Sequence, residues 1–413
     1  MSVSLIRPFA GLRPVPDQAA AVAAPPYDVL DTEEARALAV GKPWSFLHIS
    51  KPEIDLPPET SPYAPEVYAK GAENLKRMIE AGILRRDPAP CYYVYRLTMG
   101  DHVQTGLVAA GSVRAYDANR IRRHELTRTD KEDDRVRQIE AVNAQTGPVL
   151  LAYPEHPAVA EAIRATASHP PAYTVTAHDG IVHSLWVIED LAVQDLITRA
   201  FDAIPALYIA DGHHRSASAS RIAAARRAAG AAEDAVHESF LVVGFPVPEM
   251  KIFDYNRVVR DLNGLSPDAF LVALAGEFTV EACAEQARPR QAREFGLYLA
   301  GKWYRLGLRK PLPPENDPVA RLDVSLLSDR LLAPVLGIVD LRKDKRIDFV
   351  GGKRGLGELE RRVDSGEMAA AFALFATRME DLIAVADAGA IMPPKSTWFE
   401  PKLADGIVSN PLW

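Results

Sequence analysis

The stretch YIADGHHRSASA, residues Tyr208–Ala219, decides the fold of this 413-residue chain. Its first residues are apolar and favour a strand, whereas its alanine- and serine-rich end is suited to a closely packed helix. Gly212, between the two, allows a backbone geometry or a close approach that a Cβ atom would block. The stretch therefore predicts a strand, a tight turn and the N-terminus of a helix.

Polar side chains fill the predicted turn. A helix N-terminus presents free N–H groups and partial positive charge, which favour an anion. Arg215 adds a planar guanidinium suited to phosphate, while His213 and His214 can donate or accept hydrogen bonds or bind a metal. An Asp-Gly pair is ordinary turn chemistry, but five such residues from Asp211 to Arg215 indicate a phosphate site. Adjacent histidines point apart on a strand or helix, so we expect no metal shared by both.

A second charged cluster, IRRHELT at residues 121–127, precedes the turn in the sequence. Glu125 beside His124 and Arg123 can serve as a general base whose pKa its neighbours set. The alternative is a solvated, charged helix face. A charged helix is expected next, over residues 130–145.

Two proline-rich segments near the ends of the chain complete the candidate site. APPYDV at 24–29 follows a stiff, extended path and forms either an exposed arm or a rigid wall over a pocket. MPPKST at 392–397 presents an ammonium and two hydroxyls, either for phosphate or carboxylate binding or as solvated parts of a pinned arm. The candidate substrate-binding residues in these segments are Tyr27, Asp28, Lys395, Ser396 and Thr397.

Composition places the chain among ordinary soluble globular proteins, with 48% hydrophobic and 25% charged residues and a net charge of −7. The acidic balance argues against a nucleic-acid partner. We find no apolar span that could cross a membrane, no signal-peptide pattern and only two distant cysteines. A cytoplasmic protein is expected, and its oligomeric state stays open.

Alternating strand and helix patterns predict a mixed α/β fold, and the length suggests two or three domains. We expect an N-terminal arm and subdomain at 1–112, a core at 113–264 and a C-terminal α/β domain at 265–413, whose tail returns to the site. Apolar residues at 46–49 predict a strand, and those at 63–81 and 324–336 predict helices. The glycine-rich run at 351–357 lacks P-loop spacing and favours a solvated turn.

Four motifs carry a family resemblance: APPYD at 24–28, RHELT at 123–127, ADGHHR at 210–215 and MPPKST at 392–397. In this order they resemble, end to end, the bacterial "domain of unknown function 1015" family. That resemblance implies no activity.

A His-Glu segment, a charged helix, and a strand entering Asp-Gly-His-x-Arg are also similar to the ParB/sulfiredoxin fold, which includes kinases of free serine. The resemblance implies a ParB/sulfiredoxin-like phosphate-binding core, here with an N-terminal extension and a C-terminal α/β domain. It implies that Glu125 is the base and that the nucleotide is ATP or ADP with Mg²⁺. The candidate catalytic residues are Glu125, His124, His213 and His214. The candidate phosphate- or nucleotide-binding residues are Arg123, Asp211, Gly212, His213, His214 and Arg215.

The predicted function is a nucleotide-dependent phosphotransferase that acts on a small, serine-like metabolite bearing a hydroxyl group. One alternative is a phosphatase of a phosphorylated metabolite, with His213 or His214 as the proton donor. Another is a nucleotide-binding regulator without turnover.

Overall fold

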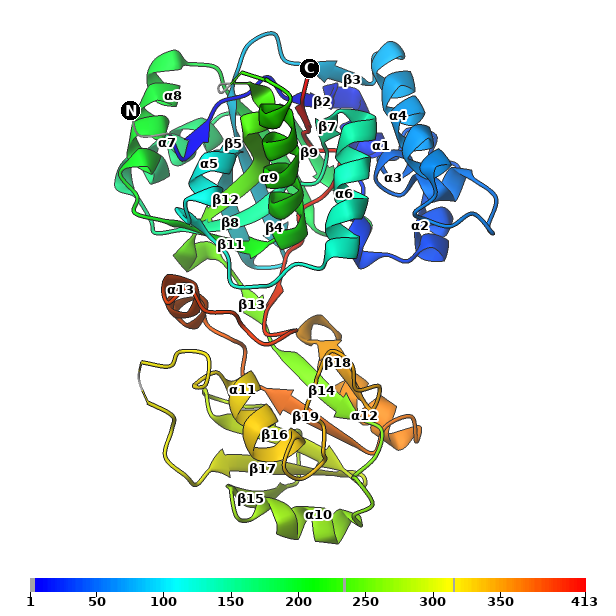
Figure 1. Ribbon diagram of the computed structural model, residues 1–413, viewed down its shortest axis with the longest axis vertical. Helices are drawn as coiled ribbons and strands as arrows, with labels where there is room; N and C mark the ends of the chain where they lie inside the picture. Colours follow the sequence, from blue (N-terminus) through cyan, green and yellow to red (C-terminus); the bar gives the residue numbers. More distant parts are fainter. Residues whose placement is uncertain (1–3, 233–234, 315) are drawn as a thin grey trace. The chain divides into compact units, whose positions relative to one another are not determined.

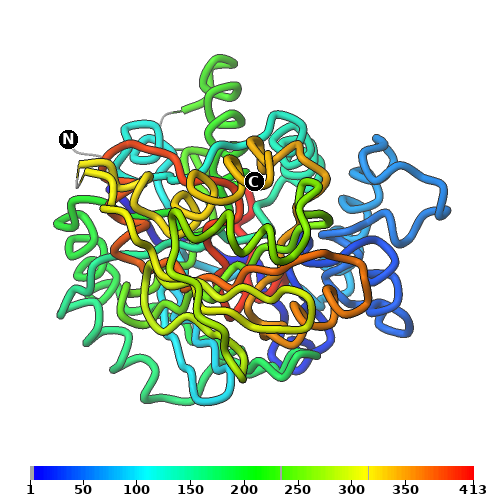
Figure 2. The backbone as a smooth tube through the Cα atoms, turned by 90° about the horizontal axis from the view of Figure 1, so that it is seen from below, coloured from blue at the N-terminus to red at the C-terminus, as the bar shows by residue number. Residues whose placement is uncertain are grey.

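The structure, a computed structural model, describes residues 4–232, 235–314 and 316–413. The chain forms two compact units (Figure 1), and Figure 2 traces its backbone from the N-terminus to the C-terminus. Unit 1 comprises the chain up to Met250 together with Pro401–Trp413, and unit 2 comprises Lys251–Glu400. Residue 264, where the sequence suggested a boundary, lies inside unit 2, while residue 112 ends a strand within unit 1.

Unit 1 is built on a nine-stranded mixed sheet with the order β6-β11-β8-β12-β5-β4-β10-β9, and β1 pairs with β5. Strand β11 is parallel to β6 and antiparallel to β8, whereas β8 is parallel to β12. The carboxyl end of β11 therefore lies beside the amino end of β8. The strands are β1 (Ile6–Arg7), β4 (Tyr92–Met99), β5 (His102–Ser112), β6 (Ile121–Arg122), β8 (Val149–Tyr153), β9 (Tyr173–Thr176), β10 (Val182–Ile188), β11 (Leu207–Asp211) and β12 (Ser239–Pro246).

Helices pack against this sheet through apolar faces. Helices α5 (Val113–Asp117), α7 (Pro157–Ala167), α8 (Leu191–Asp202) and α9 (His213–Ala228) contribute side chains to the main core. In α9, small residues face inward, and Ala219 and Ala223 are almost fully buried, which lets the helix lie close to the sheet. Helix α6 (Thr129–Val142) contacts α9 (Figure 1). It begins one residue before the predicted start and ends three residues before the predicted end.

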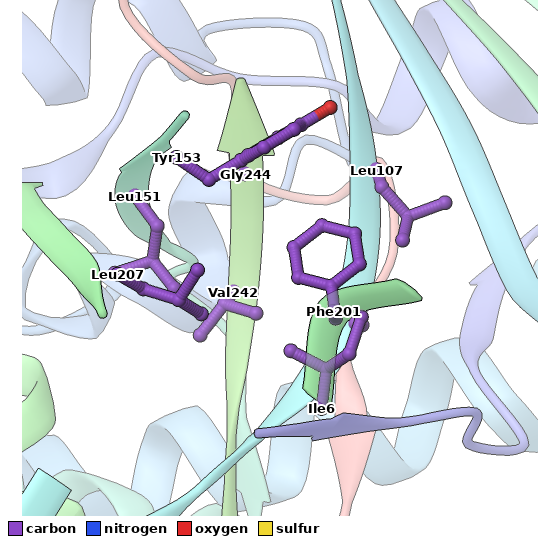
Figure 3. A pocket seen from close by; sticks show the side chains of 9 residues that line it. Ile6, Leu107, Leu151, Tyr153, Phe201, Leu207, Val242 and Gly244 are labelled. Carbon is purple, nitrogen blue, oxygen red and sulfur yellow. The ribbon is translucent and has the colours of Figure 1, made fainter. Parts of the chain in front are cut away.

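The main core closes tightly around the sheet. Its cavity of about 10 Å³ is lined by largely apolar side chains from β1, β5, β8, β11, β12 and α8 (Figure 3). This volume is no more than a single water molecule needs, and the lining offers that water few hydrogen-bond partners. The space is a packing defect of the core and has no character of a ligand site.

The N-terminal part of unit 1 forms a second apolar cluster. Its elements are β2 (Leu12–Pro14), α1 (Ala19–Val22), α2 (Thr32–Ala39), α3 (Leu47–Ser50), α4 (Pro65–Glu80) and β3 (Leu84–Arg86). The helix expected over 63–81 is present as α4. The strand expected over 46–49 is wrong, because these residues begin α3, whose Leu47 and Ile49 are buried. A short apolar run fits a buried helical turn as well as a strand.

Unit 2 has its own six-stranded sheet, ordered β15-β17-β16-β19-β14-β18, with all of its pairs antiparallel. The strands are β14 (Tyr255–Val259), β15 (Phe278–Cys283), β16 (Glu294–Leu299), β17 (Lys302–Leu308), β18 (Ile347–Gly351) and β19 (Ala370–Leu374). The helices are α10 (Pro267–Leu274), α11 (Asp323–Leu327), α12 (Gly357–Asp364) and α13 (Met379–Asp387), and α11 continues as a π-helix over Ser328–Leu332.

Short strand pairs complete the two units: β7 (Ala144–Gln145) with β21 (Asn410–Pro411) in unit 1, and β13 (Ile252–Phe253) with β20 (Trp398–Phe399) in unit 2. The mixed α/β class predicted from the sequence is confirmed. In the described ranges, every helix is too short or too polar to span a bilayer.

Candidate functional site

The predicted strand, turn and helix are present as β11, Gly212 and α9. Gly212 has a φ of +97°, which residues with a Cβ atom rarely adopt. A Cβ atom there would lie 3.2 Å from the Cα atom of Val149 and 3.4 Å from Nη1 of Arg215. Glycine is therefore required for both the turn geometry and the close approach to β8.

Arg215 lies at the centre of a buried charge cluster. Its Nη2 atom donates to Oδ2 of Asp28 at 2.8 Å, its Nη1 atom donates to the carbonyl of Pro148, and its guanidinium lies 5.7 Å from the ring centroid of Tyr27. The Nε atom is buried without a partner among the described residues. Burial alone would lower the pKa of Arg215, but the charges around it, Asp28 foremost, raise it. The guanidinium therefore stays charged.

The N-terminal segment packs against Arg215, so it is a wall of the site and not an exposed arm. Tyr27 begins a 3₁₀ turn over Tyr27–Val29. A second guanidinium, that of Arg135 in α6, lies 4.0 Å from the centroid of the Tyr27 ring and pairs with Asp134 at 2.6 Å. Two cations thus flank one aromatic ring. The sequence predicted a charged helix over residues 130–145 but did not identify Arg135 as a residue of the site.

The C-terminal tail supplies two further charges that the sequence reasoning missed. Lys402 Nζ donates to Oδ2 of Asp211 at 3.2 Å. Burial would raise the pKa of Asp211, but Lys402 and Arg215 together lower it, so this carboxylate is ionised. Asp405, only 2% exposed, accepts the backbone N–H of Tyr27 at 3.3 Å. Burial raises the pKa of Asp405 to about 7 against the opposing effect of Arg215.

The sequence did hold one signal for this part of the site. Asp405 is followed by Gly406, whose φ is +81°. The same Asp-Gly pair occurs at the turn after β11, where it contributed to the prediction of a phosphate site.

His124, Glu125 and His213 form a second cluster at the same turn. The rings of His124 and His213 meet edge to face with centroids 4.5 Å apart. The backbone N–H of His124 donates to Nε2 of His213 at 3.5 Å. On the other side of the same ring, Nδ1 of His213 lies 3.5 Å from Oε2 of Glu125. Because Nε2 accepts a hydrogen bond, we assign the proton of the neutral ring to Nδ1, which faces the carboxylate.

Burial keeps both of these imidazoles neutral near pH 7. It lowers the pKa of His124 to about 4 and that of His213 well below its usual range, where the neighbouring His124 adds to the effect. Both ring nitrogens of His124 are buried without a partner among the described residues. Glu125 is partly exposed, with 38% of its side chain accessible, so it can reach a solute.

The remaining predicted residues of unit 1 lie further out. His214 is half-buried, and its Nε2 atom accepts the N–H of Arg128 at 3.1 Å, which fixes the loop before α6. Arg123 is exposed. A cavity of about 30 Å³, lined by Tyr27, Arg135 and Arg215 among others, has room for a water-sized group beside the cluster.

Lys395, Ser396 and Thr397 belong to unit 2, where they precede β20. The Lys395 backbone has a φ of +60°, and its carbonyl accepts from Nη2 of the buried Arg257 at 3.0 Å. The Ser396 hydroxyl is buried and donates to the carbonyl of Pro393 at 2.7 Å, so it holds the loop together. Thr397 is half-buried. The meeting of these three residues with Glu125 stays a prediction.

Comparisons with known proteins give one family and several distant structures. The family model described as "Protein of unknown function (DUF1015)" matches residues 6–325. No curated protein matches the chain. A free serine kinase in complex with AMP is 12% identical, with 71% of this chain and 86% of that chain covered and a TM-score of 0.34.

Two further solved structures are similarly distant. A conserved hypothetical protein from Pyrococcus furiosus is 14% identical, with 73% of this chain and 93% of that chain covered and a TM-score of 0.34. SbnI with a C-terminal truncation, from Staphylococcus aureus, is 12% identical, with 71% and 82% covered and a TM-score of 0.36.

Proposed function

Because this chain belongs to the family "Protein of unknown function (DUF1015)", whose description names no activity, we propose its function from the geometry of unit 1. The protein is a nucleotide-dependent phosphotransferase that acts on a small, serine-like metabolite with a hydroxyl group. The motif resemblance to the ParB/sulfiredoxin fold supports the same assignment.

The observation that carries the proposal is the pairing of Glu125 with His213 at the turn that also holds Arg215. A phosphotransferase needs a base for the attacking hydroxyl next to groups that hold phosphate. Glu125 lies three residues after the end of β6, and its Oε2 atom is 3.5 Å from Nδ1 of His213. Arg215 follows His213 by two residues, in the first turn of α9.

Each residue then has a definite role. Glu125 accepts the proton of the substrate hydroxyl as the hydroxyl oxygen bonds to the terminal phosphorus of the nucleotide, while the bond from that phosphorus to its bridging oxygen breaks and ADP (from ATP) or AMP (from ADP) leaves. His213, neutral and protonated on Nδ1, orients the Glu125 carboxylate. His124 is buried against His213 and fixes the plane of its ring.

The nucleotide, ATP or ADP with Mg²⁺, would supply the phosphoryl group. The buried and unpartnered Nε atom of Arg215 and the first N–H groups of α9 fit its phosphates. Asp28 occupies Nη2 of Arg215, and 37% of its side chain is accessible, so a phosphate can displace it toward solvent. Lys395 and Thr397 are proposed to bind the carboxylate of the substrate, and Ser396, whose hydroxyl donates to the carbonyl of Pro393, to hold their loop in place.

The test is an assay of the purified full chain with ATP or ADP, Mg²⁺ and a panel of hydroxy amino acids, with the phosphorylated product detected by mass spectrometry. Glu125→Gln removes the base but keeps a side chain of the same shape, so it is expected to abolish product and to retain nucleotide binding. Arg215→Ala is expected to lose nucleotide binding. Glu140→Gln, on the exposed part of α6, is the matched control for Glu125→Gln.

The outcomes separate the alternatives. Release of inorganic phosphate from a phosphorylated metabolite without nucleotide favours the phosphatase. Nucleotide binding without any product favours the regulator. Full activity of the Glu125→Gln variant refutes the assigned base.

A further inference from the structure

A large cavity lies on unit 1 away from the Gly212 turn. Its volume is about 510 Å³, and its lining includes Tyr153 at the end of β8 and Pro246 at the end of β12. The Gly212 turn lies beside Val149, at the other end of β8. The four residue steps of strand from Val149 to Tyr153 span about 13 Å. The cavity is therefore a separate place in the fold, with a volume in the range of small-molecule sites.

Opposite charges face this cavity from both sides of one residue, Thr105. Nε of Arg96 donates to Oγ1 of Thr105 at 3.0 Å, and the backbone N–H of Thr105 donates to Oε2 of Glu249 at 2.5 Å. All three residues line the cavity. In the part of the chain that the structure describes, Arg96 and Glu249 do not form an ion pair within 4.0 Å. A cation and an anion are thus held near each other without direct contact.

The guanidinium of Arg96 is oriented in advance. Its Cζ atom lies 5.1 Å from the ring centroid of Trp186, and this stacking, with the bond from Nε, fixes its plane. Its two terminal nitrogens have no hydrogen-bond partner among the described residues. Such a planar pair of donors is the arrangement that binds a carboxylate through two parallel hydrogen bonds.

Two carboxylates, those of Glu249 and Glu155, line one part of the cavity, and the Arg164 guanidinium, which also lines it, is paired with Glu161. Burial raises the pKa of Glu249, and the nearby Glu155, which also lines the cavity, raises it further. Nδ1 of His156, next to Glu155, is buried without a partner among the described residues. An ammonium group entering here would offset both carboxylates. The side chains of Ala160 and Ile163 in α7 make part of the lining apolar.

We propose that this cavity binds an amino acid with an apolar side chain. Its carboxylate would pair with the terminal nitrogens of Arg96, and its ammonium would lie between Glu249 and Glu155. Its side chain would lie against Ala160 and Ile163. The two charged ends of an amino acid are a few ångströms apart, which matches the placement of Arg96 and Glu249 on either side of Thr105. This inference does not depend on the proposed phosphotransferase.

Isothermal titration calorimetry of the full chain with L-leucine, without nucleotide, tests the proposal. Binding is expected, and 4-methylpentanoate, without the ammonium, and 3-methylbutylamine, without the carboxylate, should each bind about tenfold more weakly or worse. Glu249→Gln and Arg96→Met should each weaken L-leucine binding about tenfold or more. Glu155→Gln changes an exposed residue, so it keeps the test valid if a buried variant does not fold.

Two variants serve as controls. Asp195→Asn, on the exposed face of α8, and Glu140→Gln, on the exposed part of α6, should leave the affinity for L-leucine unchanged. The proposal is overturned if L-leucine, L-methionine and L-phenylalanine all fail to bind at about 10 mM. It is equally overturned if the amine alone binds as tightly, or if Mg²⁺ binds in place of the amino acid.

Discussion

Replacing Asp405 by asparagine should remove a pH-dependent cost from the folded state. The pKa of this buried carboxyl rises from an ordinary 3.8 to about 7 on folding. Between these two values the folded protein retains a proton that the unfolded chain has released. The stability of the natural chain is therefore highest, as far as Asp405 is concerned, below pH 3.8, and it falls as the pH rises from 3.8 to about 7.

The size of the effect follows from the shift. Each pKa unit corresponds to about 1.4 kcal/mol, so a shift of about three units amounts to at most about 4 kcal/mol. Asparagine carries no charge and keeps an oxygen that can accept the N–H of Tyr27. The Asp405→Asn variant should therefore gain stability over the natural chain as the pH rises, by about 1.4 kcal/mol per unit between pH 4 and 7.

Urea denaturation of both proteins at pH 5, 6, 7 and 8 measures this difference directly. Asp17→Asn, at an exposed position of unit 1, is the control for the exchange of a carboxylate for an amide. The gain should level off above about pH 7, because Asp405 is then ionised in both states of the natural chain. A gain that does not change with pH, or a loss that grows with pH, refutes the reasoning.

Three further predictions concern the same turn. Gly212→Ala should destabilise unit 1 by about 1–3 kcal/mol, measured by its denaturation midpoint, whereas Gly230→Ala, also at positive φ but with open space around it, should cost less. His124→Phe removes an imidazole whose pKa falls on folding to about 4, so that the natural chain loses stability as the pH drops below 6.5. The free energy of unfolding of the variant, relative to that of the natural chain, should therefore be about 2 kcal/mol higher at pH 5 than at pH 8. A gain that is equal at both pH values contradicts a buried neutral imidazole. Arg215→Met should remove the cation with the larger effect on Asp405 and leave only Arg135, so the pKa of the Asp405 carboxyl, followed by NMR, should rise above the value of about 7.

The turn after β11 could be predicted because its requirements are local. Gly212 is needed for a positive φ, and the small residues after it suit a buried helix. A few neighbouring residues are therefore enough to predict the turn and the helix. The strand expected at residues 46–49 is wrong for a related reason. A run of four residues is too short for its period to be recognised, and the fold decides between strand and helix through contacts such as that of Asn74 with the carbonyl of His48, at 2.8 Å.

The electrostatic surroundings of the turn could not be predicted in the same way. Arg135 is one charged residue among many in α6, and the Asp-Gly pair at Asp405 indicates a turn but not its partner, so only the packing of distant segments brings these two residues to Tyr27. Asp405 lies 190 residues beyond Arg215 in the chain, yet each affects the pKa of the other. Sequence patterns report local preference, whereas pairing of charges over such separations follows from the complete fold.

The position of residues 401–413 has a consequence for biosynthesis. This tail supplies β21, Lys402 and Asp405 to unit 1, but the ribosome makes it only after the whole of unit 2. During translation, which proceeds at about 5–20 residues per second, the 150 residues of Lys251–Glu400 delay the tail by roughly 8 to 30 seconds. Throughout that interval Asp211 and Arg215 lack their C-terminal partners, so a nascent chain carries the phosphate turn in an unfinished form.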